Sequence, residues 1–72
     1  MTRLFTFDTT HHALWAEEVA GGEGIPVEVV PAPPGANARC SLALATLPEE
    51  VDRLGGELRR AGVPFSLYTA GG

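Results

Sequence analysis

The sequence predicts an α+β domain in which two βαβ units share one antiparallel sheet. Strand and helix patterns alternate as strand, helix, strand in residues 3–30 and again in residues 41–68. The halves also repeat, because Gly24-Ile25-Pro26-Val27-Glu28-Val29 returns as Gly62-Val63-Pro64-Phe65-Ser66-Leu67. Two interleaved units of this kind form the split βαβ, or ferredoxin-like, sandwich, a four-stranded antiparallel sheet of order 4-1-3-2 with both helices on one face. We therefore expect residues 1–72 to form a single ferredoxin-like domain.

In the first half, Leu4-Phe5-Thr6-Phe7 is a β-branched and aromatic run, which is typical of a strand. A helix is expected over residues 11–20, and the Gly21-Gly22 pair that follows favours its end. Gly24-Ile25-Pro26 then turns the chain into a second strand over residues 27–30. Three residues that commonly N-cap helices precede the helix: Asp8, Thr9 and Thr10.

In the second half, residues 41–45 are small and apolar almost throughout, as in a central strand that is buried on both faces. Thr46 and Glu49 have the spacing of a capping box, in which each side chain accepts a hydrogen bond from an orphan backbone N–H. This pattern predicts a helix that is capped by Thr46, has Glu49 in its first turn and runs to about Ala61, with Gly62 as the expected C′ residue. Residues 63–68 follow as the fourth strand.

One stripe of each helix is expected to face the core. In the second helix the apolar residues at three-four spacing are Val51, Leu54 and Leu58. The repeat assigns the same role in the first helix to Ala13, Ala16 and Ala20. Trp15 then lies on the outer face, where it either contacts a partner or a second copy, or covers the edge of the core.

Composition and charge limit the classes of function. The chain is 44% hydrophobic and 19% charged, which is typical of a folded domain and argues against disorder. Its net charge is −4, with five arginines, no lysine and acidic residues spread along the chain, so we do not expect it to bind nucleic acid. The apolar runs are too short to span a bilayer, and the sequence shows no signal-peptide cleavage site. We expect a cytoplasmic protein with no membrane segment, either a monomer or a small homo-oligomer.

The single cysteine, Cys40, follows a proline-stiffened loop over residues 31–34 and cannot form an internal disulfide. In the predicted topology, the start of the first helix and the loop before the third strand lie at the same edge of the sheet. We therefore expect the segment of Asp8, Thr9, Thr10, His11 and His12 to face the loop that ends in Cys40.

This placement supports thiol chemistry. The thiolate is the reactive form of cysteine, and a helix N-terminus or a neighbouring imidazolium stabilises it. Cys40 would act as a nucleophile or sulfur carrier, with His11 or His12 as charge partner or proton shuttle. Two loop residues, Asn37 and Arg39, could hold an anion. We expect no metal ion and no cofactor, because neighbouring helical histidines point about 100° apart and would not converge on one ion.

The same residues have a plainer interpretation. A lone cysteine at the start of a strand is commonly a small buried hydrophobic residue, and adjacent histidines at a helix start are commonly solvated. Under this alternative the protein is an interaction or regulatory module that uses the surface around Trp15. An enzyme has the least support, because no second acid–base pair and no phosphate-binding loop is visible. Accessibility of the Cys40 thiol in the native state separates the two hypotheses.

Four stretches carry a resemblance to a known family: Thr10-His11-His12-Ala13, Gly24-Ile25-Pro26-Val27, Val30-Pro31-Ala32-Pro33 and Cys40-Ser41-Leu42-Ala43-Leu44. From about residue 3 to 69, the chain resembles a bacterial family of selenium/sulfur carrier-like domains of unknown function. The resemblance implies that Cys40 accepts persulfide sulfur, or selenium, from a cysteine desulfurase-type donor and passes it to an acceptor protein. The chain departs from the family's usual loop, with Pro34, Asn37 and Ser41 in place of an arginine, a serine and a glycine.

Overall fold

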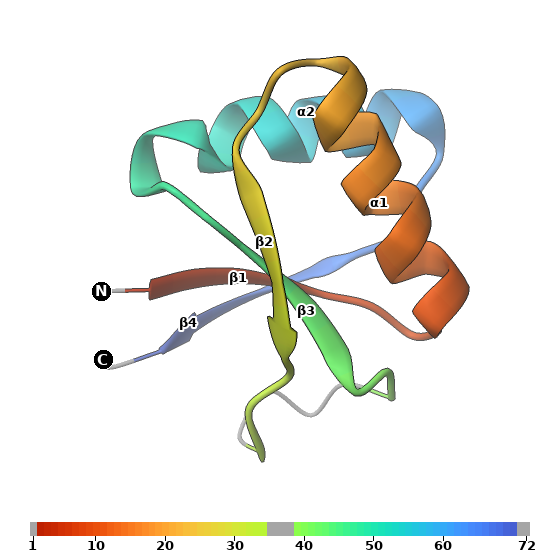
Figure 1. Ribbon diagram of the computed structural model, residues 1–72, viewed down its shortest axis with the longest axis vertical. Coiled ribbons are helices and arrows are strands. Elements are labelled where there is room, and N and C mark those ends of the chain that lie inside the picture. The colour runs from red at the N-terminus through yellow and green to blue at the C-terminus, as the bar shows by residue number, and fades with distance from the viewer. Residues whose placement is uncertain (1, 35–38, 71–72) are drawn as a thin grey trace.

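The computed structural model describes residues 2–34 and 39–70, which form an α+β fold with one antiparallel sheet and two α-helices (Figure 1). The elements in chain order are β1 (Thr2–Thr6), α1 (Thr10–Gly22), β2 (Val27–Pro31), β3 (Leu42–Thr46), the 3₁₀ turn η2 (Pro48–Glu50), α2 (Val51–Ala61) and β4 (Ser66–Ala70). The strand order is β2-β3-β1-β4, with every neighbouring pair antiparallel. This is the predicted order 4-1-3-2 read from the other edge, so the sequence-based strand order is confirmed.

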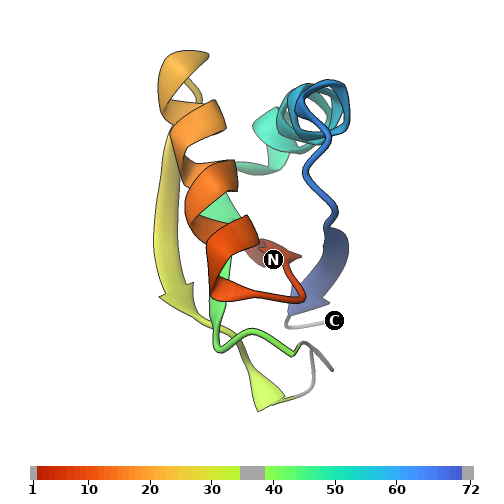
Figure 2. The same ribbon diagram turned by 90° about the vertical axis from the view of Figure 1, so that its right-hand side faces the viewer.

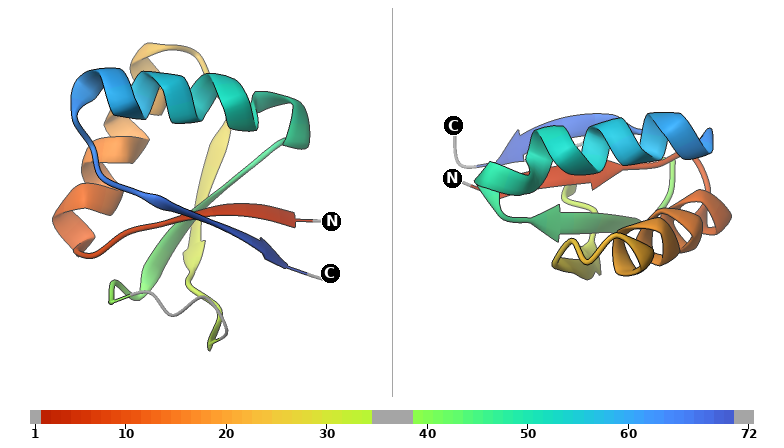
Figure 3. Two further views of the ribbon diagram at one scale, coloured as in Figure 1. Left: turned by 180° about the vertical axis from the view of Figure 1, so that it is seen from behind. Right: turned by 90° about the horizontal axis from the view of Figure 1, so that it is seen from above.

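Both helices pack on the same face of the sheet. Phe5 of β1 and Leu44 of β3 are register partners, so their side chains point to one face. Both belong to the same buried cluster as Ala16 of α1 and Leu54 of α2. In the view from above in Figure 3, the two helices lie in front of the strands. Strands β1 and β4 place the first and last described residues side by side, with Thr2 opposite Ala70 (Figure 3).

The predicted core stripes are confirmed. The buried side chains of α2 are those of Val51, Leu54 and Leu58, and Gly55 is buried with them. The buried residues of α1 are Ala13, Ala16 and Ala20. None of the helices in residues 2–34 and 39–70 is long and apolar enough to cross a membrane.

Helix α1 is capped by one of the three predicted candidates, and it begins one residue earlier and ends two residues later than predicted. Thr9 is the N-cap, and its hydroxyl accepts a hydrogen bond from the backbone N–H of His12 at 3.1 Å. The helix continues through the Gly21-Gly22 pair, which the sequence analysis took as its end. The turn comes instead at Gly24, which has φ 70°, a conformation that favours glycine.

The predicted capping box of α2 is wrong. Thr46 belongs to β3, and its hydroxyl donates a hydrogen bond to the carbonyl of Pro26 at 2.8 Å, across to the segment that enters β2. The chain enters α2 through η2, which begins at Pro48 and has no side-chain cap. Thr46, which the local pattern assigned to the helix as its cap, therefore links β3 to the segment that enters β2 instead. Gly62 ends α2 with φ 84°, as predicted.

The fourth strand begins three residues later than predicted, at Ser66 rather than Val63. The N–H of Val63 donates to the carbonyl of Leu58 at 2.9 Å, so this buried residue completes the end of α2. Phe65 then lies at the edge of the core, where the centroid of its ring is 5.1 Å from the ring centroid of Phe5.

Candidate functional site

The backbone of Cys40 is tied to the segment between β1 and α1. Residues 39–41 form a bend before β3, and the N–H of Cys40 donates to the carbonyl of Phe7 at 3.2 Å. The N–H of Ala32 donates to the carbonyl of Ser41 at 2.8 Å, which joins the segments after β2 and before β3. Figures 1 and 2 agree that the segment entering β3 lies beside the start of α1.

The sulfur of Cys40 lies between a hydroxyl and a backbone amide. Its Sγ accepts a hydrogen bond from the N–H of Leu42 at 3.3 Å. The hydroxyl Oγ1 of Thr10, the first residue of α1, lies 3.7 Å away, and either atom could be the donor. The residue is buried, with 4% of its surface exposed. If the thiol ionises, both the amide and the hydroxyl can donate to the sulfur and stabilise its negative charge.

Thr9 and Thr10 have different hydrogen-bonding roles at the start of α1. Thr9 caps the helix by accepting from the N–H of His12, and Thr10 presents its hydroxyl to the sulfur of Cys40. The cap fixes the first turn of the helix and with it the position of Thr10. Sequence patterns named both residues as caps without separating these roles.

The imidazole rings of His11 and His12 both lie near the indole ring of Trp15. His11 is exposed and His12 is half-buried, and their ring centroids lie 6.3 Å and 6.5 Å from that of Trp15. The Nδ1 atom of His12 is buried and has no hydrogen-bond partner within residues 2–34 and 39–70. In that same part of the chain, no hydrogen bond joins either imidazole to the thiol of Cys40. Their role as charge partner or proton shuttle stays a prediction.

The remaining predicted site residues are less closely defined. Arg39 is exposed and precedes Cys40 directly, and Asn37 lies outside the described residues. Anion binding by this pair stays a prediction. Within the described ranges, no group of three or more histidine, cysteine, aspartate or glutamate side chains is arranged to hold a metal ion.

Sequence reasoning missed the contribution of Leu42, whose backbone N–H is the shortest polar contact of the sulfur. The sequence signal for this contact is the two-residue spacing between Cys40 and Leu42. A side-chain acceptor in a bend commonly receives the N–H of the residue two places later, as serine and aspartate side chains do in turns. Cys40 and Leu42 have that spacing, but a sequence alone does not place a bend at Cys40.

Comparison with family models identifies the family of this chain. A family model described as "Putative Se/S carrier protein-like" matches residues 2–68, a span that includes Cys40, Thr10 and Leu42. No curated protein and no solved structure matches the chain. The match covers all but the two ends of the 72-residue sequence. The chain therefore belongs to the "Putative Se/S carrier protein-like" family.

Proposed function

We propose that this protein is a sulfur or selenium carrier of ferredoxin-like fold that holds the transferred atom on Cys40. The observation that supports this proposal is the setting of Sγ, 3.3 Å from the amide N of Leu42 and 3.7 Å from the hydroxyl of Thr10. Membership of a family described as Se/S carrier protein-like supports the same chemistry. The strand order β2-β3-β1-β4 with two helices supports the fold assignment.

Loading is a thiol exchange with a donor persulfide, R–S–SH. The thiolate of Cys40 attacks the outer sulfur, and a new bond forms between Sγ and that atom. The S–S bond of the donor breaks, and its electron pair leaves on the donor thiolate, RS⁻. Cys40 becomes a persulfide, and no oxidant or reductant is consumed. A donor of the form R–S–SeH delivers selenium through the same bond changes.

Three kinds of group assist this step: hydrogen-bond donors to the sulfur, a proton shuttle and an anion-binding pair. The N–H of Leu42 and the hydroxyl of Thr10 donate to the thiolate before it attacks. His11 or His12 takes the thiol proton and returns it to the leaving thiolate. Arg39, with Asn37, holds an anionic group of the donor near the sulfur.

The proposed partners are a cysteine desulfurase-type donor and an acceptor protein. Exchange between them takes place in the cytoplasm, where reducing conditions keep a lone thiol free. The thiol is buried in the described structure, so a donor or acceptor has to displace the residues that cover it to reach the sulfur.

A second candidate function is favoured by that same burial. Cys40 belongs to the buried cluster that includes Phe7 and Ala13. A structural cysteine in such a place would leave the protein as an interaction or regulatory module. The two functions differ in whether sulfur reaches Cys40 while the protein stays folded.

The deciding experiment is loading with glutathione persulfide, followed by intact-mass analysis of the folded protein. The carrier function predicts the added mass of one sulfur atom, removal of that atom by a reducing thiol, and no addition to Cys40→Ser. Circular dichroism of the loaded sample checks that the fold is retained. If sulfur adds only in denaturant, Cys40 is structural and the interaction module is the better function.

A further inference from the structure

Helix α1 places its large apolar side chains toward solvent and its small ones toward the core. The buried residues on α1 are all alanines, whereas Leu14 is 51% exposed and Trp15 is 37% exposed. Helix α2 has the ordinary arrangement, with Leu54 and Leu58 fully buried. Core packing therefore does not account for the two large apolar residues of α1.

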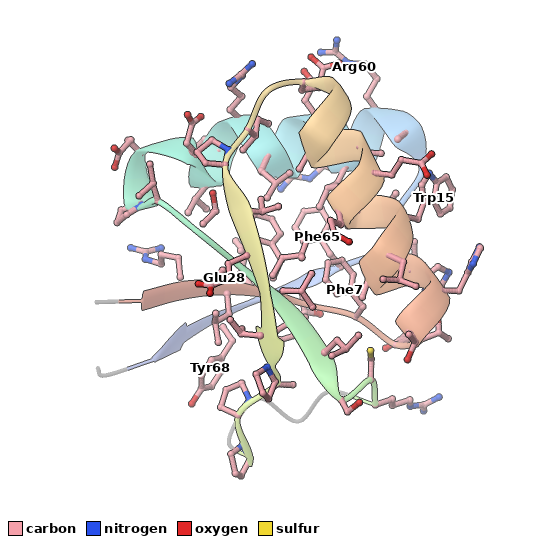
Figure 4. All side chains as sticks on the ribbon, in the orientation of Figure 1. Phe7, Trp15, Glu28, Arg60, Phe65 and Tyr68 are labelled. Atoms are coloured by element: carbon pink, nitrogen blue, oxygen red, sulfur yellow. The ribbon has the colours of Figure 1, made fainter. Side chains whose placement is uncertain are left out.

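These exposed residues form part of a hollow on the surface of α1. His11, Leu14, Trp15 and Glu18 line an open space of about 410 Å³. The ring of His11 lies 6.3 Å from that of Trp15 and forms one wall. Trp15 projects from α1 toward the edge of the molecule in Figure 4. An open, partly apolar hollow of this size suits an apolar side chain of another protein.

Apart from the two histidines, the ionisable side chains on α1 are all carboxylates. Glu17 and Glu18 are exposed, and the helix contains no lysine or arginine. Both ion pairs seen in residues 2–34 and 39–70 lie on η2 and α2, where they join Glu50 to Arg53 and Glu57 to Arg60. The exposed face of α1 is therefore complementary, in polarity and in charge, to an apolar side chain flanked by lysine or arginine.

The hollow lies on the same helix as Thr10, the residue that contacts the sulfur of Cys40. Thr10, whose hydroxyl is 3.7 Å from the sulfur of Cys40, is the neighbour of His11 in the first turn of α1. Leu14 follows Thr10 by about one helical turn, which is about 5.4 Å along the axis. A protein seated in the hollow is therefore held about one helical turn from the residue that contacts Cys40.

We propose that this hollow is the docking site for the protein that donates the chalcogen, through an apolar side chain of the donor flanked by lysine or arginine. The inference rests on the carrier function of Cys40. A second copy of the chain is a poorer occupant, because its own α1 would present Glu17 and Glu18 to the same two carboxylates.

The test uses two synthetic persulfide peptides as donors. Each carries one cysteine persulfide and one leucine, and the leucine is flanked by arginines in one peptide and by glutamates in the other. We expect the arginine peptide to load Cys40 faster than the glutamate peptide, on the order of tenfold at low salt. Leu14→Ser should remove most of this advantage, and Glu18→Lys should reverse the preference.

Two control variants match these changes elsewhere on the surface. Leu67→Ser alters another leucine that is 51% exposed, on β4. Glu28→Lys reverses an exposed carboxylate on β2, which Figure 4 places on the opposite side of the molecule from Trp15. Both controls should keep the preference for the arginine peptide. Loading by glutathione persulfide, which is too small to use the hollow, should be the same in all four variants and the wild type.

The outcomes separate the docking site from the carrier function. If glutathione persulfide loads Cys40 but the two peptides load equally, the carrier function stands and the docking site is wrong. The same conclusion follows if the preference survives both Leu14→Ser and Glu18→Lys, or if sedimentation shows a dimer that Leu14→Ser dissociates. If no donor loads Cys40 in the folded protein, the carrier function fails, and the docking site fails with it.

Discussion

The hydroxyl of Thr10 lies 3.7 Å from the sulfur of Cys40, although the two residues are 30 positions apart in the sequence. The contact joins the first residue of α1 to the bend that precedes β3. Its position depends on two other hydrogen bonds, from His12 N–H to the Thr9 hydroxyl and from Cys40 N–H to the Phe7 carbonyl. The reactivity of Cys40 should therefore depend on residues of the first helical turn.

Replacement of Thr10 by valine should slow the reaction of Cys40 with iodoacetamide and with glutathione persulfide. Valine keeps the shape of threonine but removes the hydroxyl, and loss of a hydrogen bond worth about 1 kcal/mol lowers the rate on the order of fivefold. Thr10→Ser should restore most of the rate. Thr46→Val is the matched control, because its hydroxyl donates to the Pro26 carbonyl instead. Equal rates for Thr10→Val and wild type would show that the hydroxyl does not assist the thiolate.

Replacement of Thr9 by alanine should lower the free energy of unfolding by about 1 kcal/mol, because the N–H of His12 loses its cap. Urea denaturation followed by circular dichroism measures this change. Thr9→Ser keeps a hydroxyl acceptor and should be close to wild type. A Thr9→Ala variant as stable as wild type would contradict the capping role.

Two glycine-to-alanine changes should have opposite effects on stability. Gly62 has φ 84°, so Gly62→Ala should destabilise the protein by about 1 kcal/mol. Gly56 lies inside α2, and a Cβ built there meets no atom within 4 Å. Gly56→Ala should therefore stabilise the protein by about 1 kcal/mol. Thermal unfolding of the two variants gives the sign directly, and a loss of stability in Gly56→Ala would contradict the described packing.

Replacement of Cys40 by serine should leave the protein folded. A serine hydroxyl is small enough for the buried position and can accept the hydrogen bond from the N–H of Leu42. The loss of a polarisable sulfur from the core should lower the unfolding free energy by only about 1 kcal/mol. A single cooperative urea transition with an unchanged slope supports this expectation. A broad transition, or none, would show that the sulfur is needed for packing, and Cys40→Ala would then replace it as the loading control.

Much of the fold follows from local patterns in the sequence. The three-four spacing of Val51, Leu54 and Leu58 identifies the buried face of α2, because a helix repeats every 3.6 residues. The sequence repeat carries that assignment to the alanines of α1, and the repeated βαβ pattern leads to the observed strand order. Gly62 ends α2 because few other residues adopt its positive φ.

Where one side chain could bond to either of two elements, the tertiary structure determines which hydrogen bond it makes. Thr46 has the pattern of a helix cap, yet its hydroxyl binds the Pro26 carbonyl, because pairing of β3 with β2 brings that acceptor within 2.8 Å. In the same way, the packing of α1 against the sheet decides that Thr10 lies beside Cys40, whereas His11 and His12 lie near Trp15 because of their four- and three-residue spacing on α1.

The sequence by itself determined which residue types are present and which helix faces are buried, since these depend on composition and on periods of a few residues. Only the tertiary structure decided the surroundings of the Cys40 sulfur. These surroundings are built from atoms of separate elements. The distances between such atoms depend on how helices and strands pack, and no local pattern encodes them.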